Sequence, residues 1–233
     1  MSKASYEDLL SSIPFYQSHW YMTPFIGDNY ESSNHKKLLL IGESHYMPEG
    51  STVHHDADLW YNGIPTLSEE EQRWCSTCGS RGCNTSVFTN RVNSSLHELI
   101  KSDNNAWLEV ASINYFLRPC DCKQNVNGLW RSYDGKDVDC EQAICNFIKI
   151  LDVLKPDLFV FLSCNVCKHA ERDYPKFFGG KLWDWTSLHN INYTYTNHPS
   201  SHWWYKPMKN YSRACGKTSR EYFYSWLKEN WLR

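Results

Sequence analysis

Two short clusters of polar residues carry side chains that could act together on a substrate. The first follows an apolar run and consists of Gly42, Glu43, Ser44, His45 and Tyr46. The second lies near the C-terminus and consists of Asn197, His198, Pro199, Ser200 and Ser201. Glu43 could position a water molecule, and His198 could stabilise a leaving anion. We therefore expect the active site where the two clusters meet.

A third polar position, Asn114, follows another apolar run. Its amide can both donate and accept hydrogen bonds, as recognition of a heterocycle edge requires. Backbone N–H groups around Ser200 could hold a phosphate, and glycine at position 42 would allow a tight turn against a ligand. Each residue alone also has a simpler explanation: Glu43 as a helix cap or salt-bridge partner, His198 as part of a turn, and Asn114 as a partner of loop backbone. Their recurrence after three separate runs favours a site.

The elements that would position these residues alternate between strands and helices. Continuous apolar runs predict buried parallel strands at 37–41, 107–113, 157–162 and 191–196. Helical spacing predicts helices at 87–100 and 144–154, with a first helix at 6–13 and a last one at 219–232. We expect irregular insertions at about 48–84 and 121–139. The prediction is a three-layer α/β/α fold with a central four-stranded parallel sheet, whose ligands bind at the carboxyl ends of the strands.

Length and composition limit the class of protein. The 233 residues suit a single domain spanning 1–233, and no apolar run approaches the roughly 20 residues of a membrane helix. We expect no signal peptide and no membrane, hence a cytoplasmic protein, or a nuclear one in a eukaryote. The net charge of −2 requires any phosphate binding to use a local patch. The candidate patch, which could equally be a solvated face, comprises Tyr205, Lys206, Lys209, Tyr211, Arg213, Lys217 and Arg220.

Ten cysteines in a chain with no export signal indicate reduced thiols or metal ligands. Cys75, Cys78 and Cys83 have a spacing suited to a tetrahedral metal ion, and free cysteines are the alternative. The residues that could supply a fourth ligand are His54, His55, Cys120 and Cys122. Cys164 and Cys167 open a predicted helix after the third strand, where burial is the expected state.

The motifs, taken in order, resemble the uracil-DNA glycosylase superfamily, most closely its family 4 branch. The similar segments are Gly42-Glu43-Ser44-His45-Tyr46, Val87-Phe88-Thr89-Asn90-Arg91, Asn114-Tyr115-Phe116-Leu117-Arg118-Pro119, Glu141 to Cys145 followed by Leu154-Lys155-Pro156, and His198-Pro199-Ser200. The resemblance covers about 37–204, and each motif is short, so its specificity comes from order and spacing.

The resemblance implies a role for each matching residue. Phe88 would stack on a flipped base, Asn114 would read its pyrimidine edge, and Tyr46 would exclude a methyl group. Glu43 would position the attacking water and His198 would stabilise the departing base anion. Enzymes of this kind extract a base from the stack and read it in a pocket. Trp203 or Trp204 would wedge into the duplex or, alternatively, pack in the interior.

The chain also departs from the family pattern. His45 replaces a proline, and Ser44 stands where the best-known branch has its catalytic aspartate. Family 4 enzymes carry a four-cysteine iron–sulfur cluster; Cys120 and Cys145 lie near its second pair, but the first pair has no match. A structural zinc on Cys75, Cys78 and Cys83 is therefore expected rather than a cluster, with no cofactor for catalysis.

The sequence is therefore compatible with three functions. The first is a monomeric DNA glycosylase that flips and excises uracil or a related base from single- or double-stranded DNA by hydrolysing the N-glycosidic bond. The second is a non-catalytic module on the same fold that binds nucleic acid or a nucleotide. The third is a metal-dependent hydrolase built around His45, His54, His55 and the cysteines.

Overall fold

The fold is described by a computed structural model for residues 2–82, 86–101, 105–121, 137–207, 214 and 216–233. A five-stranded sheet lies at its centre, in the order β1-β4-β2-β6-β7. Its strands are β1 (Phe25–Ile26), β2 (Leu38–Gly42), β4 (Ala111–Asn114), β6 (Leu158–Phe161) and β7 (Asn192–Tyr195). The last four are mutually parallel, and β1 pairs antiparallel with β4 at one edge. A separate parallel pair joins β3 (Tyr46–Met47) to β5 (Cys120–Asp121).

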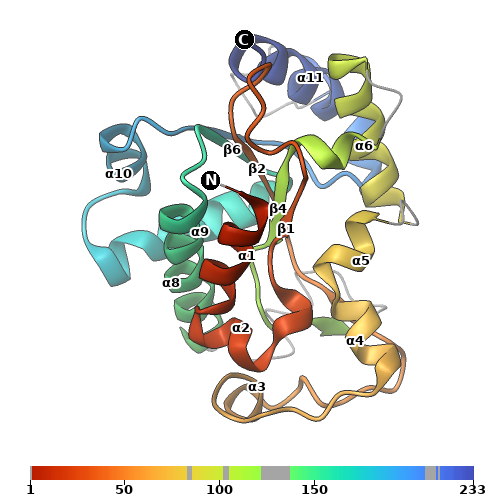
Figure 1. Cartoon of the computed structure of the whole chain (residues 1–233), viewed down its shortest axis with the longest axis vertical. Coiled ribbons are helices and arrows are strands. Elements are labelled where there is room, and N and C mark those ends of the chain that lie inside the picture. Colours follow the sequence, from red (N-terminus) through yellow and green to blue (C-terminus); the bar gives the residue numbers. More distant parts are fainter. Residues whose placement is uncertain (1, 83–85, 102–104, 122–136, 208–213, 215) are drawn as a thin grey trace.

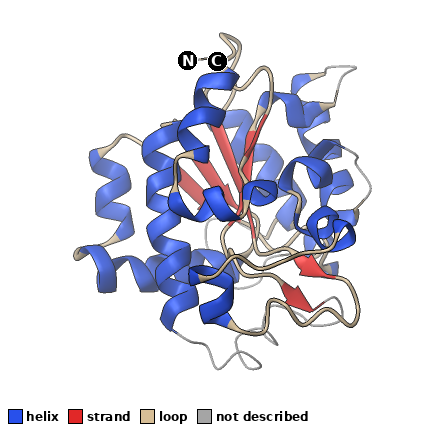
Figure 2. Ribbon diagram, turned by 60° about the horizontal axis from the view of Figure 1, so that its bottom comes forward, coloured by secondary structure: helices blue, strands red, loops and turns tan. Residues whose placement is uncertain are grey.

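Helices pack on both faces of the sheet (Figures 1 and 2). One face is covered by α1 (Lys3–Ser11), α2 (Pro14–Ser18), α8 (Asp137–Leu154), α9 (Cys164–Phe178) and α10 (Leu182–Leu188). The other is covered by α6 (Val87–Ile100), the short 3-10 helices η2 (Ala106–Glu109) and η3 (His202–Tyr205), and α11 (Ser219–Asn230). The remaining helices are η1 (Trp20–Met22), α3 (Ala57–Asn62), α4 (Glu69–Cys75) and α5 (Thr77–Gly82). The protein is thus a mixed α/β structure compatible with a three-layer arrangement.

Side chains alternate between the two faces of the sheet along each strand, which explains why helices must cover both faces. In β2, Leu39 and Ile41 enter one apolar core, whereas Leu38 and Leu40 enter the other. Because successive strand residues point to opposite faces, an unbroken apolar run is buried only when helices lie on both sides. The same rule makes these runs recognisable in the sequence.

The four predicted parallel strands and the helix at 87–100 are confirmed, but the sheet is five-stranded, because the unpredicted β1 adds an antiparallel strand beside β4. The first predicted helix lies slightly earlier, at α1, and the last ends at Asn230. The start of the second predicted strand is wrong, because Trp107 to Glu109 lie in η2. There the Asn105 side chain accepts a hydrogen bond from the Trp107 amide, which favours a helical turn over an extended strand.

The predicted irregular insertion at 48–84 is also corrected, because it contains α3, α4 and α5. Asp56 caps α3, and Ser68 forms a reciprocal capping box with Glu71 at the start of α4. These local signals stabilise short helices that carry too few apolar residues for a clear period. In the second insertion, residues 122–136 lie outside the described part of the chain, and α8 begins at Asp137.

The insertion is fastened to the domain by a buried ion pair. Arg118 pairs with Asp139 and also donates hydrogen bonds to the carbonyl oxygens of His54, at 3.0 Å, and His55, at 3.3 Å. The Tyr61 hydroxyl donates to the Asp139 carboxylate at 2.8 Å. One guanidinium therefore links the loop before α3 to the start of α8.

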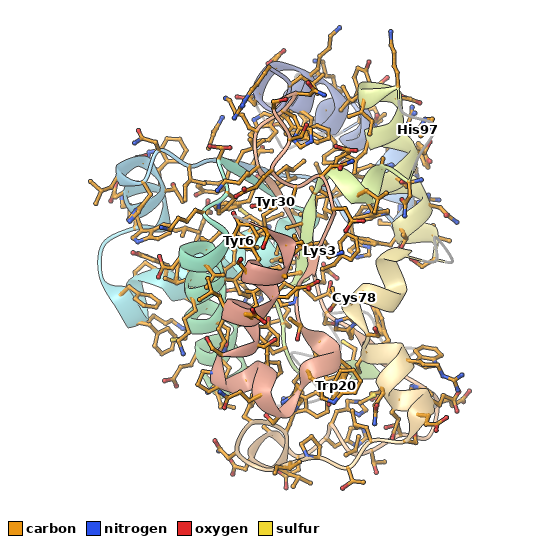
Figure 3. All side chains as sticks on the ribbon, in the orientation of Figure 1. Lys3, Tyr6, Trp20, Tyr30, Cys78 and His97 are labelled. Atoms are coloured by element: carbon orange, nitrogen blue, oxygen red, sulfur yellow. The ribbon has the colours of Figure 1, made fainter. Side chains whose placement is uncertain are left out.

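The N-terminal helix α1 is anchored by both aromatic and ionic contacts (Figure 3). Its Tyr6 ring meets Tyr30 edge to face, with centroids 5.8 Å apart. The Lys3 amine forms a 2.7 Å ion pair with Asp28.

Every helix in the described part of the chain is too short or too polar to span a bilayer.

Candidate active site

The predicted polar residues meet at the carboxyl edge of the parallel strands. Gly42 ends β2 and lies in register with Asn114, which ends β4. Ser163 follows β6 closely, and His198 comes three residues after the end of β7. In parallel sheets this edge is where ligands bind, because helix starts and loops open there. The structure therefore brings Glu43, Asn114 and His198 to one edge, as predicted.

Glu43 is a half-buried carboxyl group with a defined partner. The Ser163 hydroxyl donates a hydrogen bond to Glu43 Oε1, and Ser163 also caps the N-terminus of α9. Burial raises the pKa of Glu43, and the Ser163 hydrogen bond opposes that rise only in part. Among the described residues no lysine or arginine forms an ion pair with Glu43, so the salt-bridge explanation has no support there.

Phe88 and His198 lie against each other. Their ring centroids are 5.2 Å apart with an interplanar angle of 32°, and Trp107 lies beyond Phe88 at 6.3 Å. The Ser200 amide donates to His198 Nδ1 at 3.2 Å. An accepting Nδ1 in a neutral imidazole places the proton on Nε2, the nitrogen that could then donate to an anion. Phe88 itself is only 8% exposed.

The loop that carries His198 is held from two helices. Arg91, one helical turn after Phe88, donates to the carbonyl oxygens of Pro199 at 2.6 Å and Ser201 at 3.1 Å. At the start of α11, Ser219 Oγ accepts from the Asn197 side-chain amide at 2.9 Å. Pro199 is buried, whereas Ser200 is exposed.

The sequence did not identify Arg91, Ser163 or Ser219 as parts of this site. Ser163 had a local signal, a serine between a strand and a helix, which is typical of an N-cap. Arg91 stands three residues after Phe88, a spacing that places both on one helix face. Ser219 had no such signal.

The other polar residues of the first cluster, Ser44, His45 and Tyr46, differ in their burial and in their hydrogen-bond partners. Tyr46 is half-buried near Glu43; burial raises its pKa, so its phenol stays neutral. Ser44 Oγ donates to Cys120 Sγ at 3.6 Å. His45, in contrast, is 6% exposed and its Nε2 lies 3.1 Å from the hydroxyl of Thr77 on α5. This gives His45 a packing role rather than the substrate contact expected of it.

Gly42 also differs from expectation. It is the last residue of β2, and its carbonyl oxygen accepts from the Tyr115 amide at 3.0 Å. Its φ is not positive, so the tight turn expected at this glycine does not form there. Gly42 instead extends the sheet by one register position, opposite Asn114.

The predicted metal-binding cysteines lie in different surroundings. Cys75 is fully buried, its thiol contacts the Met47 sulfur at 3.6 Å, and burial raises its pKa. Cys78 is exposed on α5, and Cys83 lies outside the described residues. A raised pKa disfavours the thiolate that binds metal. The zinc site on these cysteines remains a prediction, as does the absence of a catalytic cofactor.

The other cysteines considered in the sequence are accounted for in part. Burial raises the pKa of Cys120 to about 12. Cys167 is 1% exposed, and Cys164 is half-buried at the start of α9. The expected burial is therefore confirmed for Cys167. Cys122 lies outside the described residues.

An aromatic and basic surface lies beside the His198 loop. Trp203 is 47% exposed with the Lys206 amine 5.3 Å from its ring centre, and the Arg91 guanidinium lies 4.8 Å from the centre of the Tyr205 ring. Trp204 is fully buried and packs near Phe223. Of the two tryptophans proposed as wedges, Trp203 is therefore the accessible one.

Two residues of the predicted basic patch are engaged within the protein. Arg220 pairs with Glu98, and Lys217 donates to Ser225 at 3.0 Å. Tyr211, Lys209 and Arg213 lie outside the described residues.

No protein-family model matches the chain, and no curated protein matches it.

Proposed function

We propose that the protein is a DNA glycosylase that hydrolyses the bond between an altered base and its sugar. The observation that carries this proposal is that Glu43, Asn114 and His198, with Phe88 against its ring, all lie at or follow the carboxyl ends of the parallel strands. A carboxylate, an amide and an imidazole beside an aromatic ring are what recognition and release of a flipped base require.

Each group has a distinct task in the proposed reaction. The Asn114 amide hydrogen-bonds to the base edge, and the ring of Phe88 lines the base pocket. Glu43, as a carboxylate, orients a water molecule whose oxygen attacks the sugar C1′. The C1′–N bond breaks, its electron pair leaves with the base, and His198 Nε2–H stabilises the resulting anion. The water proton passes to Glu43 and then to solvent or the base.

The proposal includes the finer fold assignment, a uracil-DNA glycosylase-like domain. Its support is that each family-like motif falls on the expected kind of element. The first motif lies at the end of β2, Phe88 opens α6, Asn114 ends β4, and His198-Pro199-Ser200 follow β7.

DNA is the proposed partner of the surface beside the site. The exposed Trp203 would wedge into the gap left by a flipped base, and Lys206 above its ring would meet a phosphate. We propose that the protein acts as a monomer in the compartment that holds its DNA, the cytoplasm or the nucleus.

A non-catalytic binding module on the same fold is the second candidate. The observation that favours it is the state of two expected substrate contacts: His45 is bonded to Thr77, and Phe88 is 8% exposed. A pocket of this kind could hold a nucleotide without activating water. The metal-dependent hydrolase has less support, because His45 and Cys75 are both buried and engaged within the protein.

The test is an excision assay on oligonucleotides that contain uracil, hypoxanthine or other altered bases, single- and double-stranded, with abasic sites revealed by alkaline cleavage. The proposal predicts cleavage of at least one substrate, lost in both Glu43→Ala and His198→Ala. Absence of cleavage on every substrate, with DNA binding intact, would favour the binding module instead.

A further inference from the structure

We propose that His54, His55 and Asp121 form a binding site for a divalent transition-metal ion of the zinc class. It shares no residue with the predicted cysteine site or with the proposed base-binding site, and it does not depend on the proposed function. It joins the loop before α3 to strand β5.

The three side chains present their ligand atoms to a common point. His54 Nε2 lies 3.0 Å and His55 Nε2 3.1 Å from the same carboxylate oxygen, Asp121 Oδ1. One ligand atom from each residue lies within 4.8 Å of the others. Ligands held at about 2.0–2.2 Å from a zinc ion lie roughly 2.9–3.5 Å from one another, according to coordination number. The separations between Asp121 and the two imidazoles thus already match those between ligands of one ion, and the third separation is within 4.8 Å.

The backbone around the site is fixed before any ion binds. Arg118 donates to the carbonyl oxygens of both histidines and is itself paired with Asp139. Asp121 lies in β5, in register with Met47 of β3. A site whose ligands are held by such outer contacts loses little conformational entropy on binding. The Arg118 charge is balanced by Asp139, which limits its repulsion of a cation.

The three ligands differ in exposure, which leaves one side of the site open to solvent. The side chain of His54 is fully buried, whereas Asp121 is 31% and His55 44% exposed. The ion would therefore rest on a buried imidazole and face solvent on the other side. Three protein ligands with one open side leave a position for water, the arrangement of zinc sites with exchangeable ligands.

A second group of similar composition differs from this site, because its carboxylate is already paired with positively charged side chains of the protein. Cys140, His169 and Asp173 also bring their ligand atoms together. There Arg172 donates to Asp173 at 2.8 Å and to Cys140 Sγ at 3.4 Å, and Lys176 lies 3.4 Å from Asp173. Protein cations already neutralise that carboxylate. Among the described residues, Asp121 forms ion pairs with His54 and His55 alone, and a metal ion would use both as ligands.

The test is zinc binding to the full chain, first treated with a chelator and then titrated with zinc chloride by calorimetry. The wild-type protein should bind one ion per chain at this site. His55→Ala and Asp121→Asn should each weaken zinc binding by at least about tenfold, since even loss of an outer contact to a ligand has an effect of that size. Both positions are partly exposed, so these variants are suited to retain the fold.

Two controls separate this site from other sources of binding. His97→Ala removes a histidine on α6, far from α3, the helix that follows His54 and His55 (Figures 1 and 3). Cys78→Ser tests the cysteine site predicted from the sequence. Both should leave zinc affinity unchanged. Affinity that is lost in Cys78→Ser, or unaltered in His55→Ala and Asp121→Asn, would overturn the proposal.

A spectroscopic readout on the wild-type protein needs no variant. Cobalt bound at nitrogen and oxygen ligands should give visible d–d bands without a thiolate-to-cobalt charge-transfer band. A strong charge-transfer band, or no binding of either metal, would contradict the assignment to His54, His55 and Asp121.

Discussion

The strongest chemical feature at the scale of single residues is the environment of Glu43. A carboxyl group taken out of water loses solvation of its charged form. The Ser163 hydroxyl returns only part of that loss, so the pKa of Glu43 stays raised. A carboxyl group with a raised pKa accepts a proton more readily, and burying its charged form lowers the stability of the fold.

Burial of the Glu43 carboxylate should make the stability of the fold depend on pH, whichever reaction the protein catalyses. Because the pKa of Glu43 is higher in the folded than in the unfolded protein, the folded state binds more protons in the window above the unfolded value of about 4.3. Stability therefore falls as pH rises through that window. Glu43→Gln should raise the melting temperature at pH 7, and the gain should vanish towards pH 4.

Thermal denaturation monitored by circular dichroism at several pH values checks this prediction. Glu229→Gln is the matched control, because Glu229 is exposed on α11 and its replacement should change little at any pH. A Glu43→Gln variant that melts below wild type at pH 7 would show that the charged carboxylate stabilises the fold.

The sequence predicted much of the site at this scale. Glu43, Asn114 and His198 were placed at one sheet edge because each follows a buried parallel strand. Ser163 and Arg91 were missed because their roles arise from contacts across the fold, with partners at positions 43 and 199–201. The buried state of His45 depends on Thr77 of α5, in a segment whose helices were not predicted.

At the scale of elements, α6 and α11 together position the loop that carries His198. Arg91 of α6 binds two loop carbonyl groups, and Ser219 of α11 binds Asn197. The His198 ring is thus fixed between two helices that cover the same face of the sheet.

Replacement of Arg91 should therefore affect catalysis by displacing His198. Arg91→Met keeps an apolar stem but removes both hydrogen bonds to the loop. We expect kcat for base excision to fall by about 10- to 100-fold, since a shift of about 1 Å in a catalytic group has effects of that order. DNA affinity should fall by a smaller factor than kcat, because Arg91 also contributes one positive charge to the surface proposed to bind DNA. Steady-state kinetics with an anisotropy titration would measure both.

Arg73→Met, at an exposed position of α4, is the control for loss of one positive charge. A kcat that is unchanged in Arg91→Met would mean that the loop holds His198 without this helix.

Elements with strong periodicity were predictable, and short ones were not. The parallel strands and α6 have long apolar patterns that tertiary packing only reinforces. Strand β1 has two residues, too few for any period, and it forms because β4 offers a free edge. The 3-10 helix η2 depends on the Asn105 side chain. Local capping, rather than periodicity, stabilises α3 and α4.

At the scale of the whole molecule, charge limits how DNA could bind. The net charge is −2, so attraction to phosphates must come from a local surface. Of the residues of the predicted basic patch, Arg220 is paired with Glu98, whereas Lys206 is exposed above the Trp203 ring. Each neutralised phosphate contributes about −0.9 to the slope of log affinity against log salt for duplex DNA.

Lys206→Ala should reduce the magnitude of that slope by about 1 and weaken binding to all sequences alike. Anisotropy titrations at a series of salt concentrations give the slope directly. Lys181→Ala, before α10 on the far side of the sheet from α11, should leave it unchanged (Figure 1). An equal effect of both substitutions would place the DNA elsewhere.

The most direct test of glycosylase activity is single-turnover excision of the preferred altered base by wild type, Glu43→Gln and His198→Ala, with DNA binding measured on the same samples. The proposed mechanism requires excision by wild type and a loss of at least about 100-fold in each variant, with binding retained. Excision that persists in Glu43→Gln and His198→Ala, or a wild-type protein that binds DNA but excises no base, would contradict it.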